Sequence, residues 1–187
     1  MNKAKSEKIA LYRIRAGQKE AYADLYDLYY KQIYRYIYFK VPTKERAEDI
    51  TSDAFLKCWE YINKHESAVN NFQAFIYQVA RNLIADFYKK PKDNTIPLFD
   101  EKDEEVVVRD DDTLEQIDNI SDWQILEISL RKLGQINSKW QEVLILKHIE
   151  DLSINEIARV MNESRSNVRV LIHRAMEKLK ELSKKED

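Results

Sequence analysis

Apolar residues recur at three- and four-residue intervals between positions 72 and 87, and this pattern constrains the fold more than any other feature of the sequence. Such spacing puts the apolar side chains on one face of a helix, and Asn71 stands where an N-cap would accept the first amide hydrogen bonds. Two similar stripes, at residues 25–37 and 47–62, precede this helix. Helices with such faces can bury a shared core, so residues 1–90 are predicted to form one small helical bundle.

Residues that interrupt helices are rare in this chain, which has only two glycines and three prolines among 187 residues. Many short strands and hairpins would need more of both, so the composition predicts an all-α fold. The single cysteine, Cys58, cannot form an internal disulfide, and the three histidines give no cluster with metal-ligand spacing. We therefore expect a reducing compartment and neither a metal nor another cofactor.

Segments that would direct the chain to a membrane are not found in the sequence. The first 15 residues are charged throughout, unlike the apolar region of a signal peptide, and no later apolar run is long enough to span a bilayer. The sequence therefore predicts a cytoplasmic protein without membrane insertion.

Charge is distributed unevenly along the chain, although the net charge is only −2. Residues 1–92 carry 17 Lys and Arg against 11 Asp and Glu, residues 93–130 carry 2 against 13, and residues 131–187 carry 12 against 9. Helical periodicity is absent from residues 91–120, which are predicted to form a flexible acidic linker before a second helical domain at residues 121–187. This linker could repel DNA or follow a basic channel in a partner, or it could serve only as a solvated tether.

Three serines in the second predicted domain stand where helices would begin. Ser138 with Gln141, and Ser153 with Glu156, fit the capping box, in which each side chain satisfies an amide of the other's turn. Ser164 is placed to cap the last helix. These helix starts predict a compact domain of short helices.

The last two helices of this domain are predicted at residues 154–161 and 165–182, with a turn of only three residues between them. A turn of this length is typical of a helix-turn-helix, whose second helix enters the major groove of DNA. Arginine can donate two hydrogen bonds to guanine or phosphate, and asparagine can pair with adenine. A solvated basic face on an ordinary helical pair is the alternative. The polar residues predicted to contact duplex DNA are Arg165, Ser166, Asn167, Arg169, His173 and Arg174.

Short motifs in both predicted domains occur in an order that characterises one protein family. In the first domain they are Arg15-Ala16-Gly17, Glu20-Ala21, Leu25-Tyr26, Ala47 to Ile50, Asp53 to Phe55 with Trp59, Phe72 to Tyr77, and Val79 to Asn82. In the second domain they are Gln141 to Leu144, Leu152-Ser153, Glu156 to Ala158, Val168-Arg169 and His173 to Ala175. On these motifs the chain resembles the extracytoplasmic-function (ECF) group of sigma factors, small two-domain members of the sigma-70 family of bacterial RNA polymerase.

The resemblance implies that the protein is not itself an enzyme but binds core RNA polymerase, directs it to specific promoters and helps to melt the DNA. In the family, the helix that corresponds to residues 47–62 docks against a coiled coil of the largest polymerase subunit. The polymerase-binding residues here would be Asp49, Ser52 and Asp53, with Ser52 where the family usually has Gln. Promoter DNA is the second implied partner, and an anti-sigma factor could be a further one.

The resemblance also assigns the melted downstream promoter element to the helix that starts at Phe72 and to the loop before it. The loop at residues 65–71 lies where the family captures a flipped base, which requires a pocket with aromatic or amide contacts. Phe72, Phe75 and Phe87 fall on the apolar stripe and are predicted core residues, with Phe75 where the family usually has Trp. The residues predicted to contact the downstream element are Asn82, Tyr77, Arg81, Tyr88 and Lys89.

The chain departs from the family pattern in its last two helices. The family's usual Gly-Thr is Ser166-Asn167, its frequent arginine is Leu171, and its turn glycine is Asn162. Asparagine tolerates the left-handed conformation better than most residues, so we expect the turn to survive. Glu163 occupies a usually apolar position and is expected to loosen the packing of the turn. These departures bear on the promoter sequence more than on the function.

Two other functions are compatible with parts of the sequence. A free-standing transcriptional regulator would bind duplex DNA specifically without polymerase, whereas a sigma factor would bind DNA weakly alone and act after addition to core polymerase. A helical nuclease or phosphohydrolase would use the many carboxylates, but no paired His or Asp and Glu motif recurs at metal-binding spacing. The seven tyrosines between residues 22 and 38 are expected at the edge of the core or on a partner surface.

Overall fold

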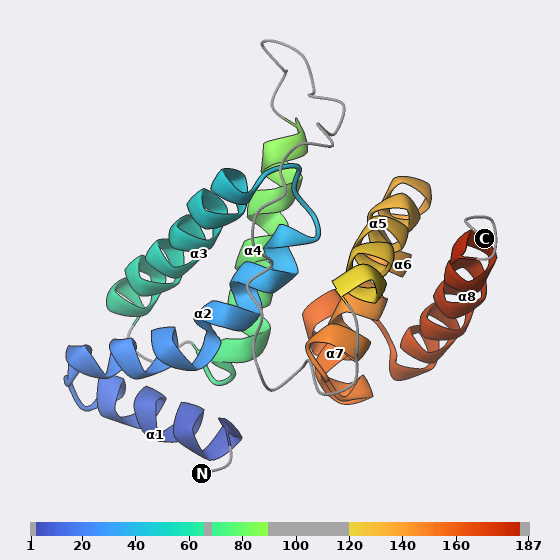
Figure 1. Cartoon of the computed structure of the whole chain (residues 1–187). Coiled ribbons are helices and arrows are strands. Elements are labelled where there is room, and N and C mark those ends of the chain that lie inside the picture. The colour runs from blue at the N-terminus through green and yellow to red at the C-terminus, as the bar shows by residue number, and fades with distance from the viewer. Residues whose placement is uncertain (1–2, 66–68, 90–119, 184–187) are drawn as a thin grey trace. The chain divides into compact units, whose positions relative to one another are not determined.

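In the computed structural model, every regular element in the described part of the chain is helical, which confirms the predicted all-α fold (Figure 1). The chain divides into two compact units, residues 1–96 and residues 97–187. The predicted acidic linker at residues 91–120 lies outside the described residues except for Ile120, so its flexibility and the domain boundaries stay predictions. The described residues are 3–65, 69–89 and 120–183, with the backbone alone for residues 120–122.

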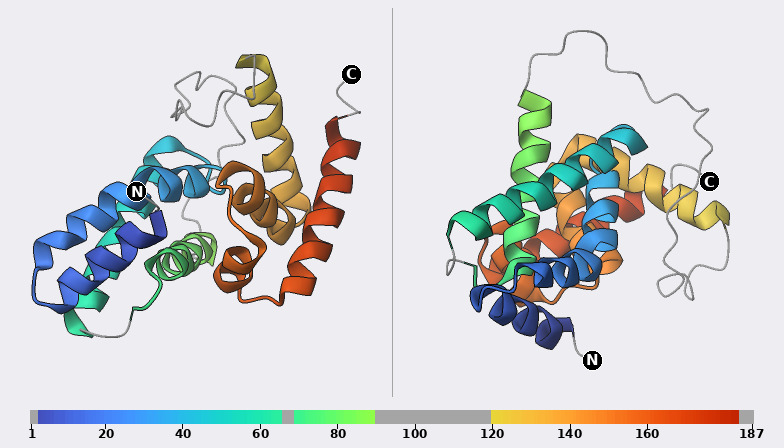
Figure 2. Two further views of the ribbon diagram at one scale, coloured as in Figure 1. Left: turned by 90° about the horizontal axis from the view of Figure 1, so that it is seen from below. Right: turned by 90° about the vertical axis from the view of Figure 1, so that its left-hand side faces the viewer.

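The first unit is a helical bundle, as predicted. α2 (Tyr22–Tyr38), α3 (Lys44–Lys64) and α4 (Phe72–Lys89) pack against one another, and α1 (Lys3–Arg15) packs along α2 (Figure 2). A short 3₁₀ helix, η1 (Lys19–Ala21), connects α1 to α2. Three of the tyrosines of α2 belong to the core of this bundle. The largest fully buried side chains of the unit are Leu25, Tyr29, Ile33, Tyr36, Ile37, Phe39, Phe72, Ile76 and Tyr77, and Tyr34 is 5% exposed.

Capping residues fix where the helices of the first unit begin and end. The Thr43 hydroxyl accepts a hydrogen bond from the Arg46 amide at 3.3 Å where α3 begins. The Asn71 side chain accepts from the Ala74 amide at 2.7 Å where α4 begins, which confirms Asn71 as the predicted N-cap. α1 is followed by Gly17, whose φ of 88° lies in the left-handed region that glycine adopts without steric cost.

α4 buries a wider arc than its stripe of apolar residues predicts. Because α4 packs against both α2 and α3, Tyr77 is fully buried, with its ring edge-on to that of Tyr36 at a centroid distance of 5.1 Å. The side chain of Tyr77 is therefore not available to DNA, and its predicted contact with the downstream element is wrong. Phe75 and Phe87, predicted as core residues, are only half-buried, whereas Phe72 is fully buried.

The second unit packs its last helix against the helices before it. α8 (Arg165–Ser183) contacts α5 (Ile120–Ile136), α6 (Ser138–Leu144) and α7 (Ile154–Met161), and a π-helix, η3 (Ile145–Ile149), follows α6. These elements enclose a core of their own. The buried apolar side chains of the unit are Trp123, Leu130, Leu133, Val143, Leu144, Ile145, Leu146, Ile149, Leu152, Ile157, Val160, Met161, Val168, Leu171 and Ala175.

The sequence predicts the N-cap of α7 correctly but not that of α6. Ser153 and Glu156 form the predicted capping box, with 3.3 Å between the Glu156 amide and Ser153 Oγ and 2.8 Å between the Ser153 amide and Glu156 Oε2. At α6 the N-cap is Asn137, because its side chain accepts hydrogen bonds from two backbone amides of the first turn. The predicted capping box of Ser138 with Gln141 is therefore wrong.

Candidate nucleic-acid and polymerase interfaces

A left-handed residue makes the turn between α7 and α8. Asn162 has φ 54° and ψ 47°, which confirms that asparagine replaces a turn glycine here. The Glu163 amide donates to the Ala158 carbonyl at 3.0 Å and closes the end of α7. Ser164 Oγ then accepts from the amide of Asn167 at 3.1 Å, which confirms its predicted role as the cap of α8. The two helices therefore meet in the tight turn of a helix-turn-helix.

One face of α8 is buried, and the other carries the residues predicted to contact DNA. Val168, Leu171 and Ala175 point into the core, with at most 9% of each residue exposed. Leu171, which replaces a frequent arginine of the family, is thus a core residue. The arginines on the opposite face can donate hydrogen bonds to phosphates or to guanine. All six predicted contacts are exposed: Arg165, Ser166, Asn167, Arg169, His173 and Arg174.

Glu163 links the turn to the helices on either side of it. Its Oε1 accepts a hydrogen bond from Nζ of Lys139 in α6 at 2.6 Å, and its Oε2 accepts from Nδ2 of Asn167 in α8 at 2.7 Å. Glu163 thus ties the turn to α6 and α8 instead of loosening it as expected. One N–H of the Asn167 amide is used in this contact, which leaves its carbonyl and its second N–H, the pair that asparagine uses to read adenine.

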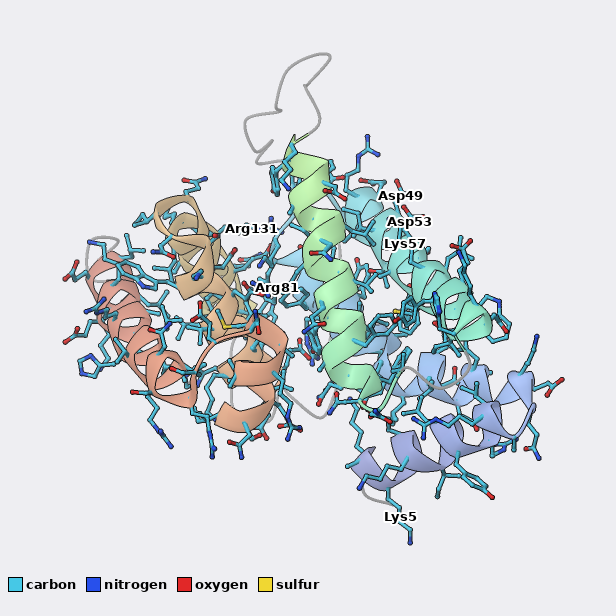
Figure 3. All side chains as sticks on the ribbon, turned by 180° about the vertical axis from the view of Figure 1, so that it is seen from behind. Lys5, Asp49, Asp53, Lys57, Arg81 and Arg131 are labelled. Atoms are coloured by element: carbon cyan, nitrogen blue, oxygen red, sulfur yellow. The ribbon has the colours of Figure 1, made fainter. Side chains whose placement is uncertain are left out.

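Four predicted downstream contacts lie on one side of the second half of α4. Arg81 and Tyr88, and likewise Asn82 and Lys89, are seven residues apart, so the four side chains form two adjacent rows. Asn82 and Lys89 are exposed. Arg81 is partly exposed (Figure 3). Tyr88 is 53% exposed, and its hydroxyl donates to the Lys40 carbonyl at 2.8 Å. Two cations beside an amide and an aromatic ring suit a single DNA strand, whose phosphates attract cations and whose bases can stack.

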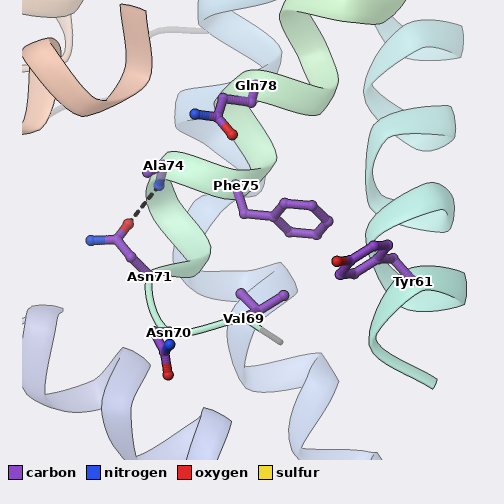
Figure 4. A pocket seen from close by; sticks show the side chains of 7 residues that line it. All are labelled: Tyr61, Val69, Asn70, Asn71, Ala74, Phe75 and Gln78. Carbon is purple, nitrogen blue, oxygen red and sulfur yellow. Dashed lines mark hydrogen bonds between the residues drawn. The ribbon is translucent and has the colours of Figure 1, made fainter. Parts of the chain in front are cut away.

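A pocket of about 210 Å³ opens at the N-terminal end of α4 (Figure 4). The rings of Tyr61 and Phe75 lie in contact there, with centroids 4.9 Å apart and planes tilted by 45°. Aromatic faces stack on any base and amides discriminate between base edges, so these walls suit one unpaired base. The volume is below the roughly 300–1,000 Å³ of pockets for drug-sized ligands. The residues that line the pocket are Tyr61, Val69, Asn70, Asn71, Ala74, Phe75 and Gln78.

The sequence predicted only the loop side of this pocket. That loop is residues 65–71, of which residues 66–68 lie outside the described part of the chain. The other walls come from Tyr61 in α3 and from Phe75 and Gln78 in α4. The three-residue spacing of Phe75 and Gln78 places them on one face of a helix, which is a signal that the sequence contains. Tyr61 carries no such signal, because tertiary packing alone brings it to the pocket.

The three predicted polymerase contacts form a row on the exposed face of α3. Asp49, Ser52 and Asp53 are all exposed, and their spacing places them on adjacent turns of the helix. Figure 3 shows Asp49 and Asp53 one turn apart on α3. Leu56 is 53% exposed and continues this row, which the sequence pattern did not predict. A row of polar side chains beside an exposed leucine suits docking on a partner helix.

Two titratable side chains in the interior of the first unit stay uncharged at neutral pH. Burial raises the pKa of the Cys58 thiol to about 12. Burial, and to a lesser extent the nearby carboxylate of Glu48, raises the pKa of Tyr34 to about 12. The row of Asp49, Ser52, Asp53 and Leu56 is called the docking row of α3. Charge near this row therefore comes from exposed residues.

Two other features are absent from the part of the chain that the structure describes. No group of three His, Cys, Asp or Glu side chains within the described ranges could hold a metal ion. None of the helices that the structure describes is long and apolar enough to cross a membrane.

Comparison with known proteins shows the class to which this arrangement belongs. The pattern of Sigma-70 region 2 matches residues 25–93, and that of Sigma-70 region 4 matches residues 127–179. The chain is 32% identical over 173 residues to the ECF RNA polymerase sigma factor BldN of Streptomyces coelicolor, covering 91% of this chain and 63% of BldN. It is 28% identical over 178 residues to the ECF RNA polymerase sigma factor SigW of Bacillus subtilis, covering 90% of this chain and 91% of SigW.

A solved structure has a similar fold. CnrH, in its complex with the cytosolic domain of CnrY, matches with a TM-score of 0.70 at 18% identity, covering 97% of this chain and 99% of CnrH. The two units thus carry the two regions that define a sigma-70 type transcription initiation factor. The chain belongs to the ECF group of RNA polymerase sigma factors, which confirms the family predicted from the motifs.

Proposed function

We propose that this chain binds core RNA polymerase in the cytoplasm, directs it to specific promoters and assists DNA melting, without catalysing a reaction itself. The observation that carries the proposal is the presence, in one chain, of a helix-turn-helix for duplex DNA and a pocket suited to an unpaired base. A promoter bound by both must be double-stranded at one element and melted at the other.

The exposed face of α8 is proposed to bind the upstream promoter element in the major groove. Residues 165–167, at the start of the helix, would reach base edges, as in other helix-turn-helix proteins. Arg169, His173 and Arg174 lie further along the helix and would contact phosphates, which fix the register of the protein on the duplex. These roles are supported by the exposure of all six side chains.

The pocket and the exposed side of α4 are proposed to bind the melted downstream element. One base would leave the stack and lie against Tyr61 and Phe75, where amide side chains can read its edge. The strand would then follow the two rows on α4, where cations neutralise phosphate and a tyrosine can stack. Those rows consist of Arg81, Asn82, Tyr88 and Lys89.

The docking row of α3 is proposed to bind core polymerase. Asp49, Ser52 and Asp53 supply polar contacts, and the exposed Leu56 adds apolar area. An anti-sigma factor is a further proposed partner, because a protein that covers this row would exclude polymerase.

In-vitro transcription with core polymerase on a promoter library tests the proposed function. If the protein is a sigma factor, transcription begins at start sites that depend on the added protein. The protein alone binds promoter duplex only weakly. Two results would overturn the proposal: no start site that depends on the protein, or tight and specific duplex binding without polymerase. The second result would indicate a free-standing regulator.

A further inference from the structure

A buried carboxylate of α1 holds the first turn of α4. Glu7 is only 7% exposed. Its Oε1 accepts a hydrogen bond from the Phe72 amide at 3.0 Å, and its Oε2 accepts from the Gln73 amide at 3.2 Å and from the hydroxyl of Tyr29. One side chain of α1 therefore satisfies two of the amides that α4 leaves unpaired at its start, across a sequence separation of 65 residues to Phe72.

An arginine at the other end of α1 holds the segment that leads into α4. Arg15 Nη2 donates to the Val69 carbonyl at 2.8 Å and to Oδ1 of Asn70 at 2.9 Å. Val69 and Asn70 both line the pocket (Figure 4). Because Arg15 engages the oxygen of the Asn70 amide, the orientation of that amide is set, and its NH₂ group is the part left to donate to a bound base.

α1 is itself packed against the bundle, so Glu7 and Arg15 are held in place. Ala10 and Leu11 are buried, at 1% and 5% exposed. The Lys3 ammonium lies 4.3 Å from the ring centroid of Tyr29, the same tyrosine that donates to Glu7. A movement of the pocket segment away from α1 would therefore have to break its hydrogen bonds to α1.

We propose that Glu7 and Arg15 are positioning residues for base capture, which hold the pocket in the shape that accepts one unpaired base and thereby set how strongly that base is discriminated. Neither residue needs to touch DNA for this role, and the inference rests on the proposed function of the pocket. An amide held in one orientation distinguishes a donor edge from an acceptor edge of a base, whereas a freely turning amide accepts either. Arg15 thus favours a base that presents an acceptor to Asn70.

The test compares base discrimination by holoenzymes that contain wild-type protein, Arg15→Ala, Glu7→Gln or the control Arg13→Ala. Arg13 is a matched control because it is an arginine of the same helix that pairs instead with Asp24, at 2.6 Å. The probe is a forked oligonucleotide from a promoter that the wild type uses. Each single-stranded position is replaced in turn by an abasic site and by the other three bases. The measured quantity at each position is the ratio of dissociation constants for substituted and original DNA.

We expect the wild type and Arg13→Ala to show a large ratio at the captured position. Arg15→Ala and Glu7→Gln should lower that ratio about three- to tenfold, the loss expected when one or two hydrogen bonds that position a group are removed. Ratios at the other positions should stay unchanged. A merely destabilised protein would have a smaller active fraction and would scale both dissociation constants equally, so the ratio reports positioning and not folding.

Two outcomes overturn the inference, and they are distinguishable. If the wild type discriminates at the captured position and both variants discriminate equally well, only the positioning role is overturned. If the wild type discriminates at no single-stranded position, the proposed function of the pocket fails and the inference fails with it. The Arg15 residue is exposed, so Arg15→Ala gives the answer if Glu7→Gln does not fold.

Discussion

Replacement of Glu7 by alanine should destabilise the first unit more than the loss of an exposed carboxylate. The change removes the acceptor of three hydrogen bonds, from the amides of Phe72 and Gln73 and from the Tyr29 hydroxyl. The bonds to Phe72 and Tyr29 are buried, whereas the bond to Gln73 is part-buried and water can replace some of it. A buried donor left without an acceptor costs about 1–3 kcal/mol, so we expect a loss of about 3 kcal/mol in the free energy of unfolding.

Two other variants give the scale for this measurement. Tyr29→Phe removes one donor and leaves both amide contacts of Glu7 in place, so its expected cost is about 1 kcal/mol. Glu20→Ala is the control, because Glu20 is exposed and surface substitutions usually change stability by less than about 0.5 kcal/mol. The three variants should therefore rank in a fixed order, with Glu7→Ala the most costly.

The full chain is unfolded in urea, and unfolding is monitored by hydrogen–deuterium exchange of the backbone amides. This measures the stability of each unit separately. The amides of Ile76 and Ala80, which lie beyond the first turn of α4 and do not bond to Glu7, report on α4, and the amide of Val168 reports on α8. Glu7→Ala should lower the unfolding midpoint of α4 and leave that of α8 unchanged. The reasoning is refuted if Glu7→Ala costs no more than Glu20→Ala, or if α8 loses as much protection as α4.

Three further predictions concern the exposed face of α8, the turn before it and the docking row of α3. Arg174→Ala should weaken holoenzyme binding to the upstream duplex and reduce the slope of log affinity against log salt concentration by about 0.9. Lys178→Ala, in an ion-paired position of the same helix, should leave the slope unchanged, and equal slopes would contradict a DNA-facing α8. Asn162→Gly should raise the free energy of unfolding by up to about 1 kcal/mol in thermal melts, because glycine adopts a φ of 54° without strain, and a loss of stability would count against this account. Asp53→Lys should weaken binding to core polymerase at least about tenfold by fluorescence anisotropy, whereas Asp27→Lys on α2 should not, and similar losses would exclude a specific docking row.

Helix positions could be predicted from the sequence where a helix buries one face of apolar side chains. The stripe at residues 72–87 predicted α4, and Asn71 predicted its start, because both signals are local. How much of the helix surface is buried does not depend on local sequence alone, because it depends on which other helices pack against it. α4 packs against two helices, so Tyr77 is as fully buried as Phe72 although it lies off the stripe. A periodic pattern cannot show how many neighbours a helix has.

α1 shows why part of the candidate site could not be predicted. Its buried residues are Glu7, Ala10 and Leu11, and the first of these counts as polar in any hydrophobic pattern. Glu7 can be buried only because donors from α2 and α4 satisfy it, and such contacts between distant segments leave no periodic signal. The same limit applies to Tyr61, which packing between α3 and α4 brings to the pocket.

The residues that depart from the family pattern explain why the chain should depend on polymerase for affinity. Leu171 lies in the core, and Glu163 engages Asn167, so the exposed side of α8, which is proposed to bind DNA, relies mainly on arginines. Residues 131–187 carry 12 Lys and Arg against only 9 Asp and Glu, which gives a weak electrostatic attraction to a duplex. When polymerase holds both units, binding of the second promoter element becomes intramolecular, so its effective concentration no longer depends on the concentration of free protein. Two weak contacts, one to duplex and one to a single base, can then give specific binding that neither unit provides alone.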